Sequence, residues 1–283
     1  FTLPLDNGAQ IQVAIRVDAA SRSATIDFTG TSAQQSNNFN APTAVCMAAV
    51  LYVFRSLVQD DIPLNAGCLK PLNVIIPPGS MLNPLPPAAV VAGNVETSTC
   101  ITNALLGALG VMAASQCTMN NFTFGNASHQ YYETISGGSG AGGVFDDAGA
   151  LVGGFGGTSV VQTHMTNSRM TDPEVLEWRF PVRLESYAIR HGSGGAGRWR
   201  GGLGIARQLS SRVDGSLLTA RGDGHVKVAL GLDGGKEGGN ARLRLAPGTG
   251  QESELPTATT AMRMTMGLAV RMETPGGGGY GVA

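Results

Sequence analysis

The sequence predicts an α+β fold, with two buried helices in the first half and an antiparallel, β-rich second half. Two observations support this prediction. The longest apolar runs, residues 41–57 and 101–114, both precede residue 120, and runs that are apolar on nearly every side are typical of buried helices. After Phe122, short segments of alternating apolar and polar residues are separated by glycine-rich turns, a pattern typical of antiparallel strands.

The first elements expected are two strands over residues 10–17 and 23–28, which form a hairpin because both alternate apolar and polar residues. Asn40 is expected to cap a helix over residues 43–58, with Pro42 in its first turn, where the missing N–H is harmless. A short strand over residues 72–76 follows this helix.

The second helix is expected over residues 100–114, with Thr97 or Ser98 as its cap. Gly107 and Gly110 lie inside this range. Because each glycine costs about 1 kcal/mol of helix propensity relative to alanine, we expect both to allow close packing against another backbone.

The second half is expected to be mainly strands. These are predicted over residues 122–124, 130–135, 160–165, 182–190 and 269–274. A short helix is expected to begin at Thr171-Asp-Pro-Glu174, with Thr171 or Asp172 as its cap. We expect a domain boundary at residue 190, between a core segment (1–190) and a glycine-rich β subdomain (191–283).

The composition excludes several classes of protein. The 283 residues carry a net charge of −1 and only 14% are charged, so neither nucleic acid nor a membrane is an expected partner. The longest apolar runs are shorter than the roughly 20 residues of a membrane span. The low charge and 42% hydrophobic content suggest a surface covered by a partner, and we expect a homo-oligomer.

The four cysteines are far apart and form no C-x-x-C pair. We therefore expect reduced thiols in a cytoplasmic protein. Three G-x-G-x-x-G matches lie outside any βαβ unit, and no P-loop motif occurs, so we expect no nucleotide site in this chain. The sequence begins without a methionine, and we expect it to be part of a longer protein.

Polar clusters flank the second helix. The first comprises Asn94, Glu96, Thr97 and Ser98, and the second comprises Ser115, Gln116, Thr118, Asn120 and Asn121. Burying unpaired amides or hydroxyls costs a few kcal/mol. These side chains therefore either satisfy one another or line a polar pocket, and the helix N-terminus is also suited to a carboxylate or phosphate.

Further candidates lie in the β-rich part. Glu133, beside Thr134 on an expected strand, is either a base or the partner of an arginine such as Arg169. His164 has polar neighbours that include Gln162, Thr166 and Asn167. Because an isolated histidine in a β-rich domain is often structural, both a structural role and a pocket role stay open.

Several long motifs resemble the hydantoinase B/5-oxoprolinase family, which also includes acetone carboxylase α-type subunits. They are Ala92-Gly-Asn-Val-Glu-Thr-Ser98, Ala114-Ser-Gln-Cys-Thr-Met-Asn-Asn121, His164-Met-Thr-Asn167, Gly192-Ser-Gly-Gly-Ala-Gly-Arg-Trp-Arg-Gly-Gly202 and Glu273-Thr-Pro-Gly-Gly-Gly-Gly-Tyr280. The similarity runs nearly end to end. Three positions depart from the pattern: Gln162 replaces a histidine, Cys117 a glycine and Leu203 an acid.

The resemblance implies ATP-dependent opening of a cyclic amide or imide, such as 5-oxoproline or a hydantoin. It implies that ATP with Mg²⁺ binds an actin-like A-type part, fused or separate, and not this chain. This chain would be the C-terminal part of a B-type part, whose upstream half carries a possible divalent metal, and it would be inactive alone. A carboxylase-type subunit using bicarbonate and a non-catalytic scaffold are the alternatives.

In the hydrolase hypothesis, the polar clusters line one pocket and stabilise an oxyanion intermediate. Glu133 and His164 transfer protons. The residues expected to bind substrate are Asn94, Glu96, Thr97, Ser98, Ser115, Gln116, Asn120, Asn121, Thr134, Thr166, Asn167 and Arg169.

Overall fold

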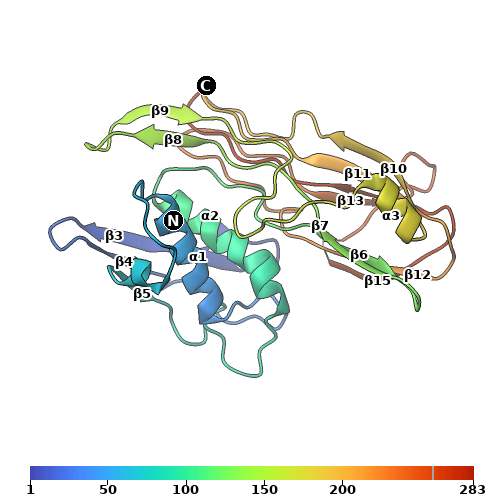
Figure 1. Ribbon diagram of the computed structural model, residues 1–283, viewed down its shortest axis with the longest axis horizontal. Helices are drawn as coiled ribbons and strands as arrows, with labels where there is room; N and C mark the ends of the chain where they lie inside the picture. The colour runs from blue at the N-terminus through green and yellow to red at the C-terminus, as the bar shows by residue number, and fades with distance from the viewer. Residues whose placement is uncertain (257) are drawn as a thin grey trace.

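The computed structural model describes residues 1–256 and 258–283 and confirms the α+β fold. Helices α1 (Thr43–Ser56) and α2 (Ser98–Ala108) lie in the first half beside a three-stranded sheet. Two larger antiparallel sheets form the other end of the molecule (Figure 1).

The N-terminal strands form two small sheets. β1 (Thr2–Pro4) pairs with β2 (Gln10–Gln12). β3 (Ala14–Asp18) and β4 (Ser23–Asp27) form the expected hairpin, and β5 (Leu72–Ile75) adds to β4 in parallel. The single strand expected over residues 10–17 is therefore divided, because its two halves pair with different partners. A short 3₁₀ helix, η1 (Ala66–Leu69), precedes β5.

Helix α1 buries one face and exposes the other. Cys46, Ala49, Val50 and Val53 recur at helical spacing and pack into the first core, whereas Tyr52 is 39% exposed. The prediction that Asn40 caps this helix is wrong. Its side-chain amide instead donates to the carbonyls of Gln35, Asn37 and Ala89.

Helix α2 continues directly from a π-helical turn, η2 (Gly93–Thr97), so no side chain caps it. It ends at Ala108, six residues earlier than predicted, and Gly110 follows in the left-handed region with φ +73°. Gly107 faces a side chain, and not the backbone we expected, since an added Cβ would lie 2.6 Å from the Phe1 ring.

Two antiparallel sheets pack around the second core. One has the order β15-β12-β6-β7 and the other β10-β11-β16-β13-β14. The first is formed by β6 (Asn121–Gly125), β7 (Gln130–Thr134), β12 (Ser216–Arg221) and β15 (Ala258–Met264). The second is formed by β10 (Val182–Ile189), β11 (Ile205–Ser211), β13 (Arg242–Leu245), β14 (Ser253–Glu254) and β16 (Ala269–Glu273). Apolar side chains from both sheets share this core, among them Phe124, Leu218, Leu209 and Val270.

Helix α3 (Pro173–Arg179) adds Leu176 to the second core. Asp172 caps it as predicted, because its carboxylate accepts from the amides of Glu174 and Val175. The strand predicted over residues 160–165 does not form. Only Val161 makes an isolated bridge, with Gly137, and the segment is otherwise a loop.

A layer of glycine-rich extended segments joins the two cores. We call residues 137–143, 192–204, 231–239 and 275–281 the glycine layer. Its backbones bond directly, for example Gly277 N to Gly202 O at 2.9 Å. An added Cβ on Gly277 would lie 1.9 Å from Ser139 O, so only glycine permits this approach. A hairpin of β8 (Gly142–Phe145) and β9 (Leu151–Phe155) extends from the layer.

Most of the buried apolar side chains fall into two clusters, one within residues 3–117 and one within residues 122–272. The domain boundary at residue 190 stays a prediction. In the described part of the chain, no helix is both long and apolar enough to cross a membrane.

Candidate active site

The loop between β9 and α3 carries His164 into contact with the first half of the chain. The backbone turns sharply there, with φ +64° at Met165 and a bond from Thr166 N to Thr163 O. This turn directs the imidazole towards α1 and towards the segment after α2. His164 therefore contacts Tyr52, which lies 112 residues earlier in the sequence, and Ser115, which lies 49 residues earlier.

Two hydroxyl groups hold the His164 ring. Nε2 lies 2.9 Å from Ser115 Oγ, and Nδ1 lies 3.4 Å from the Tyr52 hydroxyl. Ser115 is fixed in turn, since its backbone exchanges two 3.1 Å hydrogen bonds with the Asn103 amide and its Oγ accepts from Gly140 N. Both nitrogens of His164 therefore have defined partners.

The surroundings of His164 favour a neutral ring. Burial lowers its pKa to about 4, because desolvation disfavours the charged imidazolium. A neutral imidazole at pH 7 can accept a proton in a reaction or accept a hydrogen bond from a ligand.

This pKa also predicts a pH dependence of stability. A histidine whose pKa falls from 6.5 in the unfolded chain to about 4 in the folded chain takes up a proton on unfolding. Its contribution to stability is complete above pH 6.5 and is lost as the pH falls towards 4. We expect the thermal unfolding midpoint of His164→Gln to fall less than that of the wild type between pH 7 and pH 4.5. Equal falls in the two proteins would contradict this assignment.

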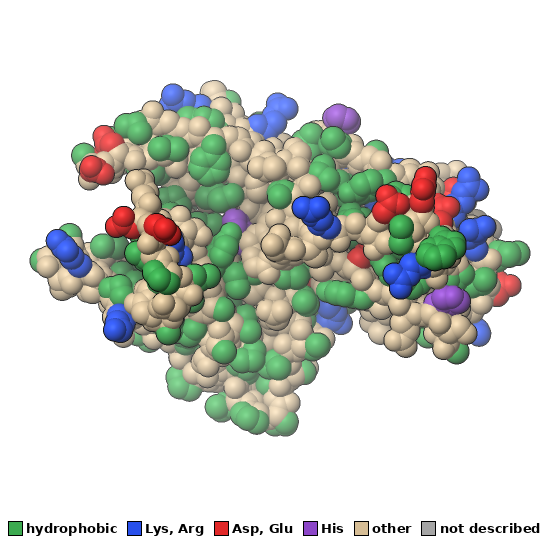
Figure 2. Space-filling model, viewed as in Figure 1, with side chains coloured by type: hydrophobic (Ala, Val, Ile, Leu, Met, Phe, Trp, Pro, Cys, Tyr) green, Lys and Arg blue, Asp and Glu red, His purple; other side chains and the backbone are tan. Residues whose placement is uncertain are grey.

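Two pockets meet at Tyr52 and His164. A polar pocket of about 380 Å³ is lined by residues that also include Ser139, Gln162 and Thr166. An apolar pocket of about 420 Å³ lies between α1 and the β8–β9 hairpin, where the surface is hollowed (Figure 2). Their volumes are within the range of small-molecule sites.

Two buried polar atoms in the polar pocket lack a partner among the described residues. They are Gln162 Oε1 and Thr166 Oγ1. Gln162 Nε2, by contrast, donates to Thr134 O at 3.0 Å, and Thr134 Oγ1 contacts Ser168 Oγ at 2.7 Å. Because buried polar groups are normally paired, these two atoms are available to pair with a ligand or with water.

The structure brings together three predicted residues of the β9–α3 loop, His164, Thr166 and Asn167, and one residue of the second polar cluster, Ser115. Thr166 and Asn167 line the pocket with His164, Ser115 contacts the ring, and Thr134 supports the loop. Arg169 is exposed and borders a neighbouring pocket of about 340 Å³.

The other predicted residues lie elsewhere. Glu96 is fully buried and accepts hydrogen bonds from Asn121 Nδ2 and, at 3.4 Å, from Met119 N. Burial raises the Glu96 pKa to about 8. The Tyr132 hydroxyl donates to Asn121 Oδ1 at 2.6 Å. This cluster adjoins β6 and β7 and does not line the His164 pocket.

Several polar groups of the two clusters satisfy one another or the backbone. Asn120 Nδ2 donates to Gln116 Oε1 at 2.8 Å. Thr97 Oγ1 and Ser98 Oγ each donate to a backbone carbonyl, and Asn94 has an exposed side chain. Because α2 begins as a continuation of η2, Ser98 does not mark the start of a helix. The anion site considered at this position stays a prediction.

Glu133 forms a buried ion pair with Arg207 of β11, and not with Arg169 as considered from the sequence. The Tyr131 hydroxyl donates to Glu133 Oε2 at 2.6 Å. Glu133 and Arg207 are 6% and 3% exposed. The carboxylate thus points between the two large sheets.

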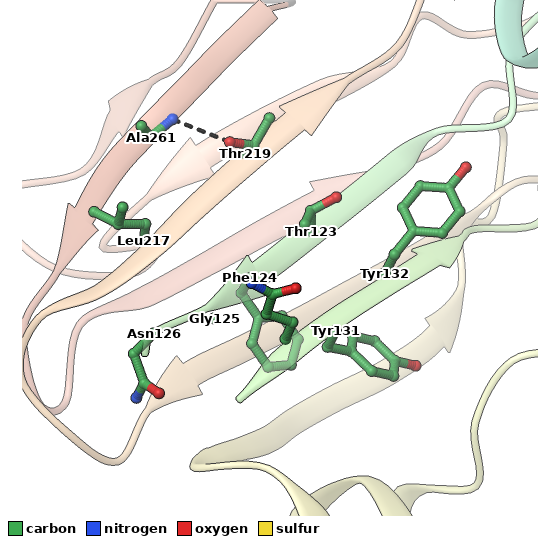
Figure 3. A pocket seen from close by; sticks show the side chains of 10 residues that line it. Thr123, Phe124, Gly125, Asn126, Tyr131, Tyr132, Leu217, Thr219 and Ala261 are labelled. Atoms are coloured by element: carbon green, nitrogen blue, oxygen red, sulfur yellow. Dashed lines mark hydrogen bonds between the residues drawn. The ribbon is translucent and has the colours of Figure 1, made fainter. Parts of the chain in front are cut away.

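A further pocket, of about 500 Å³, lies on the outer face of β15-β12-β6-β7 (Figure 3). Thr123, Tyr132, Leu217 and Thr219 line it, and Thr219 Oγ1 accepts from Ala261 N at 3.0 Å. None of the described residues that line it is charged. The His164 pocket is therefore the better candidate for chemistry.

Sequence reasoning missed Tyr52 and Arg207. Tyr52 looked like one more apolar position of a buried helix, and its contact with His164 spans 112 residues. Arg207 lies 74 residues after Glu133. Its position between Ile205 and Leu209, which share its face of the strand and lie in the core, was the available signal of a buried ion pair.

The family model described as Hydantoinase B/oxoprolinase matches residues 1–283. The chain belongs to this family. It is 44% identical over 279 residues to 5-oxoprolinase 1 of Arabidopsis thaliana and 42% identical over 293 residues to 5-oxoprolinase of Saccharomyces cerevisiae. Each alignment covers 98% of this chain but only 21% or 22% of the relative.

Solved structures of the same fold include an acetone carboxylase in its nucleotide-free form, with a TM-score of 0.80 and 17% identity. The ATP-dependent caprolactamase from Pseudomonas jessenii has a TM-score of 0.75 and 21% identity. Both cover 96% of this chain and less than half of the solved chain. At these identities the likeness establishes the fold alone.

Proposed function

We propose that this chain is part of an ATP-dependent cyclic amide hydrolase that opens the ring of 5-oxoproline or a hydantoin. The observation that carries the proposal is the His164 ring, held between two hydroxyls at the wall of two adjoining pockets. The family membership and the 5-oxoprolinase relatives support the substrate class.

His164 is proposed to accept a proton from the water that attacks the activated amide carbon. Its pKa of about 4 keeps the ring neutral before the step. The Ser115 and Tyr52 hydroxyls orient the ring, and both can hydrogen-bond to the imidazolium once it forms.

The polar pocket is proposed to hold the amide group. Gln162 Oε1, free of other partners among the described residues, accepts the ring N–H of the substrate. Thr166 Oγ1 donates to its carbonyl oxygen, where negative charge develops. The methylene carbons of the ring face the adjoining apolar pocket, which includes Leu106, Val111 and Phe155.

ATP with Mg²⁺ is proposed to bind an A-type ATPase part, either fused or separate, and the upstream half of the B-type part completes the site with its possible metal. We propose that the assembly is a cytoplasmic homo-oligomer and that this chain alone is inactive. The relatives are about five times longer than the aligned segment, which supports the need for further parts.

The test is His164→Gln in the complete enzyme. We expect the rate of 5-oxoproline or hydantoin ring opening to fall by about 10²- to 10⁴-fold, the usual contribution of a general base. ADP release and ring-opened product should be measured together, because loss of the base acts after activation by ATP.

The matched control is His191→Gln, which changes an exposed histidine in a turn and is expected to keep the wild-type rate. A wild-type rate in His164→Gln would refute the catalytic proposal and leave the chain as a scaffold. A requirement for added bicarbonate, with a carboxylated product, would replace ring hydrolysis by carboxylation.

A further inference from the structure

Two thiols and one carboxylate lie close together at the start of helix α2. Cys100 lies on α2, Cys117 lies in the segment between α2 and β6, and Asp223 follows β12. One ligand atom from each lies within 4.8 Å of the other two. The two Sγ atoms are 2.7 Å apart, and Cys100 Sγ is 3.9 Å from Asp223 Oδ2.

The backbone holds these three side chains in place. Asp6 N donates to Asp223 Oδ1 at 3.0 Å, which leaves Oδ2 towards Cys100. Cys117 has φ +60°, an uncommon conformation for a residue with a side chain. All three residues are buried, at 1%, 9% and 4% exposure for Cys100, Cys117 and Asp223.

The same region contains a second carboxylate without a compensating positive charge. Glu96 lies one helical turn before Cys100, and its Oε1 contacts Met119 N, two residues after Cys117. It is fully buried, and Oε2 has no partner in the described part of the chain. Neither Glu96 nor Asp223 is in an ion pair there.

We propose that Cys100, Cys117 and Asp223 bind a divalent metal ion of the zinc type, with water as the fourth ligand. Two thiolates and a carboxylate are a ligand set that suits tetrahedral Zn²⁺. Two Zn–S bonds of about 2.3 Å at a tetrahedral angle hold the sulfurs about 3.8 Å apart, so binding requires the two Sγ atoms to separate from their 2.7 Å contact. A bound dication would compensate the charge of an ionised carboxylate in this buried region. The two thiol protons are released to solvent on binding.

The test is a Co²⁺ titration of the complete enzyme after metal removal with a chelator. We expect a thiolate-to-cobalt charge-transfer band in the near ultraviolet that disappears when Zn²⁺ is added. Removal of one of two thiolates, in Cys100→Ser or Cys117→Ser, is expected to reduce the band by about half or to abolish it. Cys68→Ser, outside the cluster, is the matched control and should keep the band.

Absence of the band in the metal-free wild type on addition of Co²⁺ overturns the proposal, and this measurement does not depend on any variant folding. A cross-linked peptide that contains Cys100 and Cys117, found in a non-reducing digest of the wild type, would identify a disulfide between them and also overturn the proposal. A full band in both cysteine variants would assign the metal to other thiols. Asp223→Asn should weaken Co²⁺ binding by at least about tenfold, and unchanged affinity would remove Asp223 from the site.

Discussion

Arg207→Met is expected to lower the local free energy of unfolding around β7 and β11 by about 3–5 kcal/mol. The substitution keeps an apolar stem of similar length but leaves the Glu133 carboxylate buried between two sheets without its counter-charge. Loss of one partner of a buried ion pair has this cost because the remaining charge cannot regain its hydration. Hydrogen–deuterium exchange of peptides from β7 and β11 measures the change.

Two comparisons make the Arg207 result specific. Arg183→Met removes an exposed arginine whose side chain is 67% accessible and lies 3.7 Å from Glu185, and it should change stability by less than about 1 kcal/mol. The double variant Glu133→Leu/Arg207→Met removes both charges and should recover much of the lost protection. Wild-type exchange in Arg207→Met would mean that this pair does not hold the sheets together.

Gly277→Ala is expected to disrupt the glycine layer, with a cost above the roughly 1–3 kcal/mol of ordinary overpacking. The added Cβ would lie 1.9 Å from Ser139 O and 2.2 Å from Ser139 C. Both are backbone atoms, so no rotamer change relieves the clash. The bonds of Gly277 to Gly195 and Gly202 would also be lost.

The measurement for Gly277→Ala is exchange in peptides covering residues 137–143 and 192–204, which should lose protection relative to the wild type. Gly250→Ala is the matched control, because a Cβ there meets nothing within 4 Å. It should be neutral or slightly stabilising, since alanine restricts the unfolded chain. Equal protection in both variants would show that the layer can separate without cost.

The elements with strong local signals were predicted from the sequence. α1 and α2 are long apolar runs, and α3 has Asp172 as a cap before Pro173. The segment 160–165 was wrongly assigned to a strand, although its valines and threonine favour one. Its conformation depends on contacts with the glycine layer: Val160 N donates to Leu203 O, and Val161 forms an isolated bridge with Gly137. Val160 has φ +55°, which interrupts an extended strand.

The candidate site was predicted in its residue types more than in its geometry. His164, Thr166 and Asn167 are near one another in sequence, so their shared pocket followed from local spacing. Ser115 and Tyr52 reach the same ring only through the tertiary fold. Glu133 lies on the expected strand, but alternation alone does not say which face of the sheet is covered. It also does not predict that Arg207 lies opposite the carboxylate on that face.

The glycine layer affects how sequence variation among relatives should be interpreted. Its close backbone contacts leave no space for a side chain at Gly138, Gly202 or Gly277. Natural selection would then preserve these glycines for steric reasons, whatever substrate each relative uses. Invariance at these positions would therefore say little about catalysis. Under the proposed function, variation at Tyr52, Gln162 and Thr166 would follow changes of substrate.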